Sequence, residues 1–106
     1  MFTNWKQKWI EALRSGKYRQ GQSLLSFTIL DEEPQYCCLG VLRDIMGTND
    51  FSYKQENTTL SSLQLSVCGL DRETQRILIQ LNDVKMWDFN QIADYIENSL
   101  QDKVHQ

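Results

Sequence analysis

Residues 36–42 read YCCLGVL, and this stretch predicts a strand that runs directly into a helix. Gln35 to Cys37 are expected to form the strand, and Leu39 to Met46 are expected to form the helix because their apolar side chains recur at helical spacing. Residues 24–30 alternate apolar and polar side chains, which is typical of a second strand. The stretch therefore predicts an antiparallel hairpin near residues 24–37 that is followed by a helix.

Three more helices are predicted from apolar spacing and capping residues. In the first, from about Asn4 to Ser15, two tryptophans lie one turn apart on the apolar face. Asp71 and Asp88 are suited to begin the last two helices, because an aspartate side chain accepts hydrogen bonds from the free N–H groups of a first turn. The apolar stretch over residues 60–67 indicates either a short helix or a turn.

The length and composition are typical of one small globular domain. The chain has 106 residues, of which 41% are hydrophobic and 24% are charged. No apolar run approaches the length of a membrane span, and no signal-peptide pattern is present, so we expect a cytoplasmic protein. We expect an α+β fold in which about four helices pack with a small antiparallel sheet. The domain is expected to span residues 1–101, with a disordered tail over residues 102–106.

Sequence patterns that would indicate catalysis or metal binding are missing. The single histidine, His105, lies near the C-terminus, where it offers no base to a cysteine nucleophile. The three cysteines form no CxxC pair, which argues against a zinc site. Glycine-rich phosphate loops and the HExxH motif are also absent from the sequence. We therefore expect a protein that is not an enzyme, with no catalytic residues, no metal and no cofactor.

Charge is distributed unevenly along the chain. Residues 1–22 carry five basic side chains and one acidic side chain, a net charge of +4. The remaining residues carry six basic and 13 acidic side chains, a net charge of −7. The low isoelectric point of about 5.0 makes nucleic acid an unlikely partner. The basic segment is therefore either a solvated helix face or a local site for an anion.

The polar loop after the first helix is the stronger candidate for a binding site. Arg14 and Lys17 supply positive charge, Tyr18 supplies a flat face for stacking, and Gln20 donates and accepts hydrogen bonds. Gly21 lets the backbone approach a ligand closely. These features suit a small molecule that carries a phosphate and a base. In the alternative interpretation, the two cations complement the negative end of the helix and the tyrosine packs on the hairpin.

Two further segments are added to this candidate site. Cys38 and Gly40 lie where the second helix begins, and free N–H groups at that position favour anions. Asn82 and Asp83 are expected to contact the polar edges of the ligand. In the alternative interpretation, the small thiols fill a crowded corner between strand and helix.

Four sequence blocks together resemble a family of small proteins of tailed bacteriophages and prophages. The blocks are ALRSGKYxQG over residues 12–21, CCLGVL over residues 37–42, LND over residues 81–83 and FxxIAxxIE over residues 89–97. The chain departs from the family at Arg43, where the family often has a further cysteine, and it lacks a proline that often precedes the third helix.

The resemblance implies a phage accessory protein that counters host defence in the host cytoplasm. One such class sequesters nucleotide-like signalling molecules without cleaving them, and the basic loop fits that role. The alternative is a protein–protein inhibitor that binds a host or defence enzyme through its acidic surface. Sequestering proteins often form symmetric oligomers, so a homo-oligomer is part of what the resemblance implies.

Overall fold

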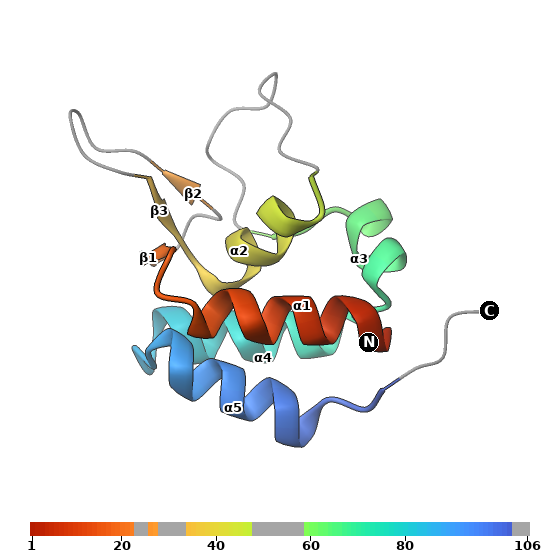
Figure 1. The fold of residues 1–106 in the computed structure, drawn as a ribbon. Coiled ribbons are helices and arrows are strands. Elements are labelled where there is room, and N and C mark those ends of the chain that lie inside the picture. The colour runs from red at the N-terminus through yellow and green to blue at the C-terminus, as the bar shows by residue number, and fades with distance from the viewer. Residues whose placement is uncertain (23–25, 28–33, 48–58, 103–106) are drawn as a thin grey trace.

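Five helices and a three-stranded sheet make up the parts of the chain that the structure describes. The computed structural model describes residues 1–22, 26–27, 34–47 and 59–102, with residues 26–27 described by their backbone (Figure 1). In chain order the elements are α1 (Thr3–Arg14), β1 (Arg19–Gln20), β2 (Ser26–Phe27), β3 (Gln35–Tyr36), α2 (Cys38–Ile45), α3 (Ser62–Cys68), α4 (Arg72–Asp83) and α5 (Phe89–Ser99).

The sheet differs from the predicted one in the direction of one strand. Its strand order is β1-β3-β2. β2 pairs antiparallel with β3, with Ser26 opposite Tyr36, inside the predicted hairpin region; residues 24–25 and 28–33 of that region lie outside the described residues. β1, which the sequence predicts to be part of a polar loop, pairs parallel with β3. The prediction of an entirely antiparallel sheet is therefore wrong.

Backbone and side-chain hydrogen bonds explain why β1 joins the sheet. The Gly21 N–H donates to the Tyr36 carbonyl at 2.8 Å, immediately after the paired residues of β1. The neighbouring Gln20 side chain is held by two hydrogen bonds to other segments. A strand of two polar residues has no alternating pattern, so this pairing has no signal in the local sequence.

α3 accounts for the difference between five helices and the predicted four. The Ser61 hydroxyl accepts a hydrogen bond from the Gln64 N–H at 3.1 Å, and the Gln64 side chain accepts one from the Ser61 N–H at 2.9 Å. This reciprocal pair is a capping box, which stabilises the start of a short helix. Gly69 ends α3 with a φ of +75°, and a Cβ at this position would lie 3.1 Å from Phe2. Glycine is therefore required both by the backbone conformation and by the close approach of the N-terminal segment.

The core lies between α1, α2, α4 and α5. α1 packs most extensively against α5, and the two helices run side by side with α4 behind them (Figure 1). α2 packs against both α1 and α4, and it also contacts β3, the strand that precedes it. None of the described helices is both long and apolar enough to span a membrane. The largest fully buried apolar side chains are Trp9, Leu39, Leu42, Leu78, Ile92 and Ile96.

Lys6 joins the start of the chain to the end of α5. Its side chain is buried in spite of its charge, and its Nζ donates to the Leu100 carbonyl at 2.7 Å and to Asp102 Oδ1 at 2.8 Å. Leu100 is the C-cap of α5, so the ammonium lies at the negative end of that helix. Asp102, which the sequence places in the tail, thus contacts α1, and residues 103–106 lie outside the described residues.

Candidate functional site

The side chain of Asn82 joins three segments that lie far apart in the sequence. It is fully buried in α4. Its Oδ1 accepts hydrogen bonds from Gln20 Nε2 at 2.9 Å and from the Cys38 N–H at 3.2 Å. Its Nδ2 donates to the Gly21 carbonyl at 2.9 Å and to Asp83 Oδ1 at 2.7 Å. Both acceptor sites and both donors of the amide are therefore used within the protein.

The sequence blocks at residues 12–21 and 37–42 thus meet in space, and the Asn82 amide lies where they meet. Gln20 makes a second hydrogen bond, from Nε2 to the Trp87 carbonyl at 2.8 Å. Gly40 is buried in α2, away from solvent. The structure therefore places five of the predicted site residues in one internal hydrogen-bonded network. We call this network the Asn82 cluster; it consists of Gln20, Gly21, Cys38, Asn82 and Asp83.

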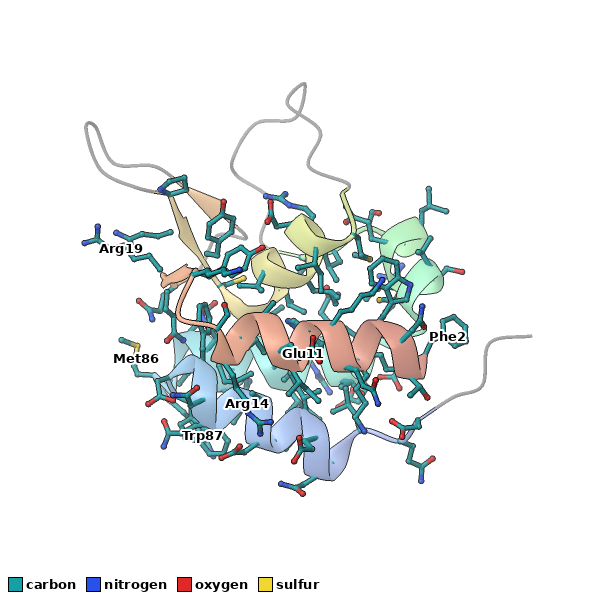
Figure 2. All side chains as sticks on the ribbon, viewed as in Figure 1. Phe2, Glu11, Arg14, Arg19, Met86 and Trp87 are labelled. Carbon is teal, nitrogen blue, oxygen red and sulfur yellow. The ribbon has the colours of Figure 1, made fainter. Side chains whose placement is uncertain are left out.

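Arg14 is directed toward α5 instead of toward the loop that follows α1. Its guanidinium donates to Asp94 at 2.6 Å and to Glu97 at 3.0 Å (Figure 2). The hydrogen bond to Asp94, followed by the one to Glu97, raises the pKa of Arg14 above its ordinary value. The pairs are exposed, so each contributes little to stability. The two ion pairs matter more for the candidate site, because Asp94 and Glu97 neutralise the positive charge of Arg14 that the sequence analysis expected to bind a ligand.

A shallow surface groove lies between α1 and the end of α2, beside the loop that contains Lys17 and Tyr18. Its volume is about 380 Å³. Two of the predicted residues, Lys17 and Tyr18, line it, and the sequence interpretation missed the other members. The missed residues on α1 follow one helical face, with spacings of three, four and seven residues, and this periodicity is the signal that reveals them. The groove is lined by Lys8, Glu11, Ala12, Ser15, Lys17, Tyr18 and Ile45.

Tyr18 is fixed in the groove by contacts with the sheet and with α2. Its hydroxyl donates to Asp44 Oδ2 at 2.5 Å, and its ring meets the ring of Tyr36 edge to face, with 5.1 Å between the centroids. Burial, together with the hydrogen bond to Asp44, raises the pKa of Tyr18. The phenol therefore stays neutral at physiological pH, and its ring is held in one orientation at the groove.

The three cysteines are buried, free thiols. Burial raises the pKa of the Cys37 thiol to about 11 and raises the pKa of the Cys38 thiol as well. Cys68 shows the same direction for the same reason. Because the thiolate is the reactive form of cysteine, these side chains are poor nucleophiles at neutral pH. Cys37 and Cys38 fill the corner where β3 runs into α2, and Cys68 packs in the core at the end of α3.

Titration of Cys37 predicts a loss of stability at alkaline pH. The thiol ionises at a lower pH in the unfolded chain, near 9.0, than in the folded protein, near 11. The folded protein therefore has its full unfolding free energy below pH 9. It loses about 2–3 kcal/mol of this free energy as the pH rises through 11, because the thiol then ionises more readily in the unfolded chain. Urea unfolding between pH 8 and pH 11 measures this decline. Cys37→Ser, which does not titrate, should show a smaller decline, and equal declines in both proteins would contradict the assignment.

Metal ligands do not gather in the described part of the chain. Among residues 1–22, 34–47 and 59–102, no group of three or more histidine, cysteine, aspartate or glutamate side chains is placed to hold an ion.

Comparison with known protein families identifies a matching family model. The family model described as Domain of unknown function (DUF8296) matches residues 1–69. No curated protein and no solved structure matches the chain. The matched region extends from the N-terminus through α3 and includes every residue that lines the groove, whereas Asn82 lies beyond it. Since the match covers well over half of the sequence, the chain belongs to the DUF8296 family.

Proposed function

We propose that this protein binds a small anionic, nucleotide-like molecule in the groove between α1 and α2 and sequesters it without chemical change. The observation that carries the proposal is the presence of two lysines and an oriented tyrosine ring in one groove of a protein whose net charge is −3. Within the described residues, the Lys17 side chain is exposed and has no carboxylate within ion-pair distance. Its ammonium is therefore available to a phosphate.

The chemistry of the groove suits binding better than catalysis. A lysine ammonium donates charge-assisted hydrogen bonds to phosphate oxygens, and the Tyr18 ring and the Ile45 side chain offer apolar contact to a base or sugar. Cys37 and Cys38 are the residues whose type would suit a nucleophile, but both thiols are neutral and buried. These properties support a protein that holds its ligand and does not transform it.

The biological setting is part of the same proposal. The resemblance of four sequence blocks to phage and prophage proteins supports a counter-defence protein that acts in the host cytoplasm by withdrawing a nucleotide signal. Assembly into a homo-oligomer would raise the number of ligands that one particle withdraws. Both statements rest on the resemblance and on the groove together.

Nucleotide binding and its dependence on Lys17 test the proposed function. A thermal-shift screen with mono-, di- and cyclic nucleotides should raise the melting temperature for at least one ligand. Lys17→Ala should lower the affinity for that ligand about tenfold, because a hydrogen bond between two charged groups is lost. Lys85→Ala, which removes an exposed lysine from the turn after α4, is the matched control. No shift with any nucleotide, or equal behaviour of the two variants, would refute the proposal.

One observation favours a second candidate function, inhibition of a protein partner. Leu63 and Val67 lie one turn apart on α3 and are 73% and 44% exposed. Exposed apolar side chains of this size are typical of binding surfaces, and the acidic body of the chain would complement a basic enzyme. Here Leu63→Glu should abolish capture of a host protein, whereas Lys17→Ala should leave it unchanged.

A further inference from the structure

The two lysines of the groove lie at its opposite ends. Lys8 and Ser15 are seven residues apart on one face of α1, which is about 10 Å along the helix axis. Lys17 lies just beyond Ser15, and the Ser15 hydroxyl accepts a hydrogen bond from the Lys17 N–H at 3.1 Å. The Lys8 ammonium lies over the Trp5 ring, 5.0 Å from its centroid, one turn farther from Lys17. The two lysines therefore enter the groove from backbone positions about two helical turns apart along the direction of α1.

A negative charge lies between these two positive charges. Glu11 is one turn after Lys8 and one turn before Ser15, and it lines the same groove. Its side chain is exposed and projects from the middle of α1 (Figure 2). A carboxylate at this position repels a phosphate in the centre of the groove and accepts hydrogen bonds from an amino group. The sequence of charges along the groove is thus positive, negative, positive.

The surface between the charges is partly apolar. Ala12 and Ile45 supply aliphatic contact, and Tyr18 supplies an aromatic ring whose orientation is fixed by its contact with Tyr36. The volume of about 380 Å³ is within the range of small-molecule sites. This surface suits the uncharged middle of a ligand, such as a nucleoside.

We infer that the groove selects nucleotides whose phosphate groups are attached to two different ribose carbons over nucleotides whose phosphates are joined to each other. One phosphate contacts Lys8, the other contacts Lys17, and an amino group of the base donates to Glu11. The inference rests on the proposed function, because it specifies the class of ligand for the same groove. The corresponding chemical class is a nucleoside 3′,5′-bisphosphate or a longer nucleotide with the same separation of charge.

Two isomers of equal composition test this selectivity. Adenosine 3′,5′-bisphosphate and ADP carry the same base and the same number of phosphates, and they differ in where the phosphates are attached. Isothermal titration calorimetry at fixed ionic strength should show that the 3′,5′-bisphosphate binds about fivefold more tightly, the contribution expected of one additional exposed charge contact. Lys8→Gln should reduce binding of the bisphosphate about fivefold and leave ADP within about twofold.

Glu11→Gln provides the second arm of the test. Removal of the central carboxylate should strengthen ADP binding and narrow the preference, because the repulsion of a central phosphate is lost. Lys85→Gln is the control and should change neither affinity. If the two isomers bind the wild-type protein equally, or if Lys8→Gln keeps the preference, the inference is overturned while the proposed function stands. If neither nucleotide binds, and no other nucleotide does, the proposed function itself fails.

Discussion

Replacing Asn82 with alanine is expected to lower the free energy of unfolding by about 3 kcal/mol, because several buried partners lose their hydrogen bonds at once. The Cys38 N–H and the Gly21 carbonyl are both buried. The Cys38 N–H donates to the side-chain oxygen of Asn82, and the Gly21 carbonyl accepts from the side-chain nitrogen of Asn82. The change also leaves a cavity at a fully buried position. Urea unfolding at neutral pH, followed by tryptophan fluorescence, measures the loss.

A second asparagine provides the matched control. Asn90 lies in the first turn of α5 and is exposed, so Asn90→Ala should change the unfolding free energy by less than about 0.5 kcal/mol. If Asn82→Ala is no more harmful than Asn90→Ala, then the Asn82 cluster does not hold the fold together. A large loss of stability together with nucleotide affinity that is unchanged in the remaining folded protein would show that the cluster and the groove are separate.

Replacing Trp9 with alanine is expected to cost about 4 kcal/mol of unfolding free energy, in the range observed for large aromatic residues in protein cores. Trp9 is fully buried, and its indole Nε1 donates to the Cys38 carbonyl at 2.8 Å. Trp9→Phe keeps most of the apolar volume and loses this hydrogen bond, so it should cost about 1–2 kcal/mol. Thermal and urea unfolding of both variants separate the packing contribution from the hydrogen bond.

Trp5 is the natural control for Trp9, because it lies one turn earlier on the same helix. It is half-buried, and the Lys8 ammonium lies over its ring in a cation–π contact. Trp5→Ala should therefore cost distinctly less stability than Trp9→Ala. The opposite order would mean that the core is not arranged around Trp9. Trp5→Ala should in addition release Lys8, which the nucleotide-selectivity experiment can detect.

The buried contacts of the core and the residues of the proposed binding groove thus lie in different parts of the same sequence blocks. Trp9 and Asn82 both bind the backbone of one residue, Cys38: its N–H donates to Asn82 Oδ1, and its carbonyl accepts from Trp9 Nε1. Lys17 and Tyr18 lie in the adjoining loop and face the groove. The adjacent cysteines, Cys37 and Cys38, belong to the buried core and not to the groove.

Helix positions were largely predictable because their signals are local. Asp71 and Asp88 cap α4 and α5 as predicted, with hydrogen bonds from the Thr74 and Gln91 N–H groups at 2.7 Å and 2.8 Å. α1 and α2 begin and end within a residue or two of the predicted limits. Each of these predictions uses residues within one or two turns of each other.

The candidate site was predicted in part for the same reason. Lys17 and Tyr18 were recognised from the composition of one loop, and they do line a groove. Lys8 and Glu11 have no such signal, because the sequence does not show that the end of α2 lies beside their face of α1. The side chain of Ile45, which completes the groove, comes from a helix that begins more than 20 residues after α1 ends.

The sequence by itself determined four of the five described helices, the caps of α4 and α5, the segregation of basic charge near the N-terminus and the apolar character of the corner at residues 37–42. The tertiary structure alone decided what the charged and polar side chains do. Arg14 is directed to α5 by carboxylates 80 or more residues away, and Asn82 is engaged by partners up to 62 residues away. Spacing along a helix determines which face a residue occupies, but the partner of that face depends on long-range packing, which leaves no periodic pattern in the sequence.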